Sequence, residues 1–131
     1  MKTIYNNPEV TKRFNYLRCL KDGWFDGKGE ALSSNGLFWL EKCFSYYYLE
    51  DFPFPYMYPT PEGNVQIECT IGTNHISLEI ELATHRGYWH NADFSLADIS
   101  SATVETKTLN LDQPNGWEWF ICKLEQLKNS K

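Results

Sequence analysis

Two segments in the middle of the chain alternate between apolar and polar residues. Apolar side chains occupy every second position in residues 65–71 (VQIECTI) and again in residues 76–82 (ISLEIEL). A period of two places all the apolar residues on one face of a β-strand, so we predict two half-buried strands. A two-residue turn at Thr73-Asn74 would keep both apolar sets on the same face of the resulting hairpin.

This turn fixes the pairing of the two predicted strands. The expected pairs are Ile71 with Ile76, Cys69 with Leu78, Ile67 with Ile80, Glu68 with Glu79 and Gln66 with Glu81. Like charges directly opposite one another in an antiparallel pair are unfavourable. Glu68 and Glu79 are therefore expected to need a compensating positive charge or screening by solvent and salt.

Weaker patterns on the carboxyl side of the hairpin indicate two further strands. A third strand is predicted at residues 88–93, and a fourth, rich in threonine, at residues 102–109. Alignment of Leu82 on the second strand with Trp89 on the third places His90 opposite Glu81.

Three segments have the periodicity and the end signals of helices. The first begins at residues 7–9 (NPE), with a capping residue, a proline and an acid, and ends at Asp22-Gly23. The second begins at residues 33–34 and fails near Glu50, because four prolines follow between residues 53 and 61. That proline-rich segment is expected to run extended with few ladder hydrogen bonds. The third helix begins at Gln113-Pro114.

The predicted order is two N-terminal helices, an antiparallel meander of about four strands, and a C-terminal helix packed on one sheet face. Helices and strands that occur in blocks, rather than in strict alternation, indicate an α+β fold. We expect a single domain over residues 1–131. The helices should cover the sheet face that carries Val65, Ile67, Leu78, Ile80 and Trp89.

Composition narrows the classes of protein that fit. The chain has 131 residues, a net charge of −5 and 42% hydrophobic residues, which excludes a disordered chain. No apolar stretch is long enough for a membrane helix and no secretory signal is recognisable, so a cytoplasmic protein without membrane association is expected. Residues 51–131 hold five Lys or Arg against eleven Asp or Glu. This excess of negative charge opposes nucleic-acid binding.

The predicted polar face of the sheet is the first candidate site. Glu68, Glu79 and Glu81 can supply oxygen ligands and His90 a nitrogen ligand to a divalent cation. The same carboxylates can instead bind a basic patch on a protein partner, or simply be solvated. These three alternatives remain open at the level of sequence.

The glycine-rich loop at residues 22–30 (DGWFDGKGE) is the second candidate. It matches neither a calcium-binding loop nor a phosphate-binding loop. One interpretation is a tight connection whose Trp24 and Phe25 enter the core. The other is a recognition loop that presents Trp24, Asp26 and Glu30.

An aromatic and proline-rich segment at residues 46–61 is the third candidate. One helix face cannot bury three consecutive tyrosines, so some rings must be exposed, line a cleft or contact another chain. The alternative is that the segment closes the end of the core. The aromatic residues concerned are Tyr46, Tyr47, Tyr48, Phe52, Phe54, Tyr56 and Tyr58.

Candidates for catalysis are weak. His85 and His90, with Asp93 and Glu81 nearby in sequence, can in principle act as a base and an orienting acid. No serine or cysteine lies in a nucleophile-elbow motif. The four cysteines form no Cys-x-x-Cys pair, so we expect thiols that pack as small apolar groups. No catalytic residue and no cofactor are assigned.

Two motifs give the chain a family resemblance. Residues 23–31 (GWFDGKGEA) and residues 59–63 (PTPEG), with residues 78–90 (LEIELATHRGYWH), resemble a family of small uncharacterised bacterial proteins. The resemblance extends over roughly residues 17–127. It implies a prokaryotic, cytoplasmic, single-domain protein, and it carries no catalytic residues over to this chain.

The hypothesis that best fits these features is a non-catalytic protein-interaction or accessory module. It would bind a protein partner or a second copy through residues 46–61 and 22–30, with the acidic sheet face as an additional surface. An antitoxin-like protein that neutralises a basic partner would suit the charge. The alternatives are a metal-assisted hydrolase on the acidic face and a small-ligand-binding domain with an aromatic cleft near Tyr56 and Trp24.

Overall fold

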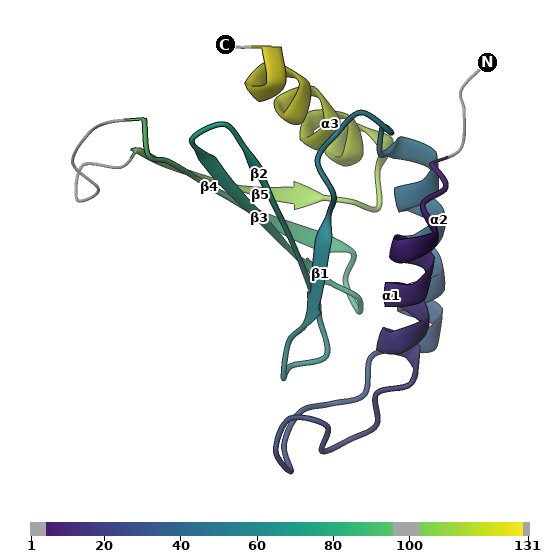
Figure 1. Ribbon diagram of the computed structural model, residues 1–131. Helices are drawn as coiled ribbons and strands as arrows, with labels where there is room; N and C mark the ends of the chain where they lie inside the picture. Colours follow the sequence, from purple (N-terminus) through teal and green to yellow (C-terminus); the bar gives the residue numbers. More distant parts are fainter. Residues whose placement is uncertain (1–4, 96–102, 130–131) are drawn as a thin grey trace.

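A computed structural model describes residues 5–95 and 103–129 of the chain. Within these residues, three helices and five strands form an α+β structure in which the strands make one antiparallel sheet with the order β1-β2-β3-β4-β5 (Figure 1). The elements are α1 (Pro8–Arg18), α2 (Ser34–Tyr47), β1 (Tyr56–Pro59), β2 (Val65–Ile71), β3 (Asn74–Glu81), β4 (Arg86–Asp93), β5 (Thr103–Asn110) and α3 (Pro114–Asn129).

The capping residues explain where the first two helices begin. The Asn7 side chain accepts a hydrogen bond from the Glu9 backbone N–H at 2.9 Å, and the Ser33 hydroxyl accepts one from Gly36 at 3.0 Å. Both starts agree with the sequence prediction. Both helices end earlier than predicted: α1 ends at Arg18 and α2 ends at Tyr47.

The sheet has five strands rather than about four. The additional strand, β1, lies inside the proline-rich segment and pairs its four residues with β2, from Tyr56 opposite Glu68 to Pro59 opposite Val65. Prolines confine this strand to an edge of the sheet, because proline cannot donate a ladder hydrogen bond.

The pairing of β2 with β3 differs from the prediction by two residues. The turn lies at Gly72-Thr73, so Ile71 faces Asn74 and Glu68 faces Ser77. Gly72 has a φ of +60° at the first central position of the turn, where a type II′ hairpin favours glycine. Asn74 joins the strand and is buried. A shift of two residues keeps every side chain on its predicted face.

The pairing of β3 with β4 also differs from the prediction. Leu78, rather than Leu82, lies opposite Trp89. His90 therefore faces Ser77, and Glu81 faces Arg86.

The core lies between the sheet and the helices, on the predicted sheet face. Trp89 of β4 packs edge-on against Trp119 and Phe120 of α3, with ring centroids 5.4 and 5.9 Å apart. Trp117 of α3 in turn contacts Trp39 of α2. Further fully buried core side chains come from α1, α2 and the inward positions of β1, β2 and β3, among them Phe14, Leu17, Leu37, Leu40, Phe44, Met57, Val65, Ile67, Leu78 and Ile80.

Replacement of Gly116 by alanine tests the junction between β5 and α3. A β-carbon at residue 116 would lie 2.1 Å from the backbone oxygen of Asn110, which cannot rotate away. Alanine gains about 1 kcal/mol in helix propensity, whereas overpacking of this kind costs about 1–3 kcal/mol or more. We expect Gly116→Ala to lower the free energy of unfolding by roughly 2 kcal/mol in urea denaturation.

The neighbouring, exposed Asn115 provides the control. Asn115→Ala changes helix propensity without a clash and should leave the urea midpoint equal or slightly raised. A midpoint for Gly116→Ala at or above that of the unsubstituted protein would contradict the packing at this junction.

Candidate functional site

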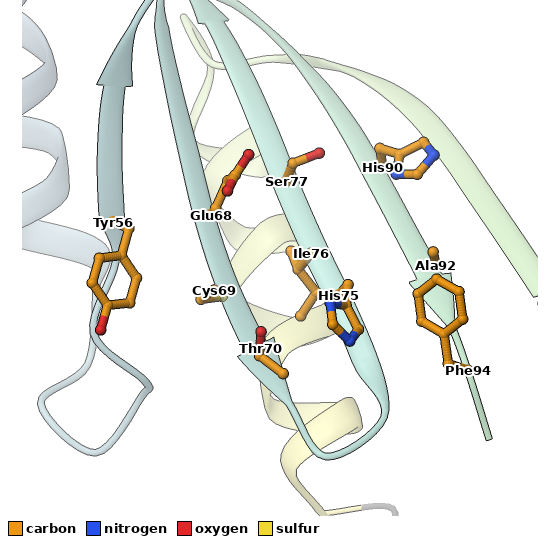
Figure 2. A pocket seen from close by; sticks show the side chains of 10 residues that line it. All are labelled: Tyr56, Glu68, Cys69, Thr70, His75, Ile76, Ser77, His90, Ala92 and Phe94. Carbon is orange, nitrogen blue, oxygen red and sulfur yellow. The ribbon is translucent and has the colours of Figure 1, made fainter. Parts of the chain in front are cut away.

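One face of the sheet is buried by helices and the other is not. Side chains on alternate positions of all five strands lie on the face opposite the core. In Figure 2 the labelled side chains of Glu68, Ser77 and His90 project from this face, while α3 lies behind the sheet. We call this surface the open face. Its residues are Tyr56, Tyr58, Gln66, Glu68, Thr70, His75, Ser77, Glu79, Glu81, Arg86, Tyr88, His90, Ala92, Val104, Thr106, Thr108 and Asn110.

The open face carries an excess of negative charge. It holds three carboxylates, Glu68, Glu79 and Glu81, against one guanidinium, Arg86. Within the described chain, none of these carboxylates forms an ion pair. Asn64 Nδ2 donates to Glu79 at 3.3 Å, and the Thr84 hydroxyl donates to Glu81 at 2.7 Å. These carboxylates are solvated or held by neutral donors, and are available to a cation.

A groove of about 410 Å³ crosses the open face between Tyr56 on β1 and Phe94 just after β4 (Figure 2). Strand pairing places Glu68, Ser77 and His90 in one row across its floor, because Glu68 faces Ser77 and Ser77 faces His90. The Tyr56 side chain is opposite Glu68 on the other side and is 56% exposed. The groove therefore combines aromatic ends with a polar floor.

Glu68 is the half-buried carboxylate of this groove. Gln66 Nε2 donates a hydrogen bond to Glu68 Oε2 at 2.6 Å. Oε1 accepts no hydrogen bond from a described residue. The carboxylate is thus held by one neighbour while one oxygen stays free for a ligand.

Hydrogen bonds to the β2–β3 turn place Phe94 at its end of the groove. The Thr73 hydroxyl donates to Asp93 Oδ1 at 2.7 Å, and the Phe94 backbone N–H donates to the Thr73 carbonyl at 2.9 Å. The Phe94 ring meets His75 edge-on, with centroids 4.9 Å apart. Hydrogen bonds from Thr73 and then from the Ser95 backbone lower the pKa of Asp93 below its ordinary value.

The structure does not bring the predicted metal ligands together as expected. The hypothesis of a cation site depended on Glu68 lying opposite Glu79 and His90 lying opposite Glu81. Glu79 instead faces Gln66, while Glu81 faces Arg86. No group of three or more His, Cys, Asp or Glu side chains within residues 5–95 and 103–129 is arranged to hold a metal ion.

The predicted aromatic segment divides between the core and the surface. Tyr48 and Phe52 are buried, and Phe54 is half-buried against Tyr56. Tyr47 stacks on Trp117 with ring centroids 5.5 Å apart. The exposed members are Tyr46, Tyr56 and Tyr58. Both interpretations of the segment therefore hold for part of it: it closes the core and it also presents exposed rings, two of them on the open face.

The glycine-rich loop is built on its own contacts and does not enter the core. Trp24 is half-buried and its indole N–H donates to the Glu30 carbonyl at 2.8 Å, whereas the Phe25 side chain is 53% exposed. Asp26 has a φ of +53° and, like Glu30, is exposed. The expectation that Trp24 and Phe25 enter the core was wrong, because a bridge between Phe25 and Lys28 folds the loop back on itself.

The two motifs that carry the family resemblance meet in space. The Glu30 backbone N–H of the glycine-rich loop donates to the Pro61 carbonyl at 2.9 Å. Gly63 has a φ of +87°, and a β-carbon added to this residue would lie 3.6 Å from Glu30 Cβ. These motifs therefore join the α1–α2 connection to the β1–β2 turn, which is a structural role.

His85 has a structural role at the other end of the sheet. Its ring stacks on Trp39 with centroids 3.6 Å apart, and Nδ1 lies 2.6 Å from Asp112 Oδ1. Burial, and then the Asp112 carboxylate, raise the pKa of the nearby Cys43 thiol. This cluster holds the β3–β4 turn against α2 and the connection between β5 and α3. Because the thiolate is the nucleophilic form of cysteine, the raised pKa does not favour an activated Cys43.

A buried cysteine lies beneath the groove. Burial raises the pKa of Cys69 to about 11. This thiol therefore packs as an apolar group, as predicted. The prediction was wrong for Cys19 and Cys122, which are exposed.

Comparison with known proteins adds no family to this geometry. No protein-family model, no curated protein and no solved structure matches the chain. The structure gives one further finding about class: no helix among the described residues is both long and apolar enough to span a bilayer.

Three residues that line the groove, His75, Ala92 and Phe94, were not named from the sequence. His75 has the same parity as Ser77 and Glu79, so extending the alternation by one residue would have placed it on the polar face. Phe94 gave no such signal, because its position depends on the bond between Thr73 and Asp93 rather than on strand periodicity.

Substitution of Thr73 tests how the Phe94 end of the groove is held. The pKa of Asp93 is lowered in the folded protein. Its hydrogen bonds therefore stabilise the fold fully above the ordinary carboxyl pKa, and this stabilisation is lost as the pH falls through the lowered pKa. Thr73→Val removes the hydroxyl donor, so we expect the Asp93 pKa to rise in a carboxyl-carbon NMR titration.

Thr70 is the matched control, since Thr70→Val makes the same change on an exposed position of the open face. The pKa of Asp93 should be unchanged in that variant. An equal Asp93 pKa in the Thr73→Val and unsubstituted proteins would rule out the proposed anchoring.

Proposed function

We propose that this chain is a non-catalytic protein-interaction module whose open face binds an arginine-bearing segment of a partner protein. The observation that supports this most directly is the groove itself. In it a half-buried carboxylate with a free oxygen, Glu68, lies beside an exposed aromatic ring, Tyr56.

The chemistry of the groove suits a guanidinium group. Arginine forms paired hydrogen bonds with a carboxylate, and its planar group stacks on aromatic rings. Glu68 offers the carboxylate and Tyr56 the ring on adjacent strands. Gln66 holds the carboxylate in place, which reduces the side-chain entropy lost on binding.

The shape of the open face suits an extended segment better than a small molecule. A second hollow of about 510 Å³, lined by Gln66, Glu79 and Tyr88 among others, adjoins the first, and Ser77 and His90 line both. Each hollow contains one carboxylate and one tyrosine, and the second is also lined by Lys107. A peptide with basic residues at intervals can fill both, whereas a single small ligand fills one.

An accessory role follows from this binding mode. A protein of net charge −5 whose open face carries three carboxylates that form no ion pair with a described residue is suited to cover a basic surface on a partner. Neutralisation of a basic protein, as an antitoxin does, is the form of this role that we propose. The loop at residues 22–30 is not part of the proposed surface.

A peptide titration tests the proposal. We would use blocked peptides that differ only in three alternate positions, occupied by Arg, Lys or Glu, and record amide chemical shifts of the full chain. The Arg peptide is expected to shift resonances of β1 to β4, and Glu68→Gln should weaken its binding about tenfold, as loss of one charge-assisted pair implies. Added salt should weaken binding as well.

Glu125 of α3 provides a matched control. It is an exposed carboxylate on a helix behind the sheet, so Glu125→Gln changes the net charge equally without touching the open face. If the two variants lose affinity equally, or if the Glu peptide binds as well as the Arg peptide, the proposed interaction is wrong.

A further inference from the structure

The two edges of the sheet are protected to very different degrees. At the β1 edge, Arg13 of α1 donates from Nε to the Met57 carbonyl at 2.7 Å, and prolines flank the four-residue strand. At the other edge, β5 is eight residues long. Among the described residues, the backbone hydrogen bond of its outward groups lies at the end of the strand, where the Asn110 carbonyl accepts from the Gln113 N–H at 3.3 Å, and Val104, Thr106 and Thr108 make none. Such an edge is a template for pairing with another strand.

The sequence of β5 is complementary to itself when it is paired antiparallel. A two-fold axis perpendicular to the sheet keeps the helix-covered faces of the two copies on the same side of the joined sheet. Because side chains alternate between the two faces, residues paired across the axis must belong to the same face, so the axis passes through a residue and not between two neighbouring residues. With the axis at Thr106, Glu105 lies opposite Lys107 of the partner subunit, and Lys107 lies opposite Glu105 of the partner subunit. Val104 then faces Thr108 of the partner subunit.

The neighbouring registers bring like charges together. An axis at Glu105 places two glutamates face to face, and an axis at Lys107 does the same with two lysines. Like charges directly opposite one another destabilise an antiparallel pair. The charges of β5 therefore favour the Thr106 register over both of its neighbours.

The charged side chains are available for this pairing. Lys107 Nζ lies over the Trp119 ring at 5.5 Å and forms no ion pair within the described chain. Glu105 accepts hydrogen bonds from Trp89 and Lys123 of its own chain at 3.2 and 2.9 Å. A carboxylate has room for a further donor, and these bonds hold it at the edge.

We propose that two copies of this chain associate through the outer edges of their β5 strands, in an antiparallel pairing centred on Thr106 that continues the sheet from one copy into the other. An interface of this kind is isologous, so every contact occurs twice. It does not use the groove beside Tyr56, although Thr106, Lys107 and Thr108 also line the second hollow of the open face, and it does not depend on the proposed function.

Charge reversal at Lys107 is the first test, with light scattering and sedimentation of the full chain as the measurement. Lys107→Glu creates two Glu–Glu contacts in the dimer, so the dissociation constant should rise at least about tenfold. Lys28→Glu makes the same change in the exposed loop at residues 22–30 and should leave the constant unchanged. A chain that remains monomeric up to millimolar concentration, or a dimer that Lys107→Glu does not weaken, overturns the proposal.

Cysteine cross-linking tests the register, in a background where the exposed Cys19 and Cys122 are replaced by serine. Thr106→Cys would face Thr106→Cys of the other copy at about 4.5–5.5 Å between Cα atoms, within reach of a disulfide. Oxidised glutathione should then convert this variant to a covalent dimer. In Thr108→Cys the two thiols lie four positions apart, about 13 Å, and should remain unlinked. Equal cross-linking of both variants, or none in either, contradicts the Thr106 register.

Discussion

The burial of one face of an antiparallel sheet is the constraint on which the rest of this molecule depends. Val65, Leu78 and Ile80 are fully buried beneath the helices, and burial of each such side chain stabilises the fold by about 1.5–3 kcal/mol. Because strand side chains alternate with a period of two, burying one set forces the other set outward. The acidic and aromatic open face is therefore a direct consequence of core formation.

The same alternation explains which parts of the fold are predictable from sequence. The faces of β2 and β3 were predicted correctly, since a shift of two residues leaves every side chain on its side of the sheet. The partners across the strands were not, because they depend on whether Gly72 or Asn74 forms the turn. Asn74 is held by Asn91 on the next strand, at 2.9 Å, and such a contact is invisible in a local pattern.

The candidate site was predictable to a similar degree. Glu68, Tyr56 and Tyr58 were named from composition and alternation, and they lie on the open face. The cation hypothesis failed because it required correct cross-strand partners. Burial of Tyr48 but not of Tyr46 depends on where α2 ends. The backbone becomes extended at Tyr48, with φ of −71° and ψ of 140°, and this directs the Tyr48 ring into the core beside Phe44 and Tyr5.

The arrangement of the sheet edges connects the two proposed interactions. Pairing at β5 through an axis perpendicular to the sheet would place the open faces of both copies on the same side of one continuous sheet. Two grooves would then face a single partner, and a partner with repeated basic segments would engage both with an effective concentration set by their spacing. The closed edge at β1, capped by Arg13, would limit assembly to two copies instead of an open fibre. Weak binding at each single groove is then sufficient for a high overall affinity, because both grooves of the dimer bind the same partner.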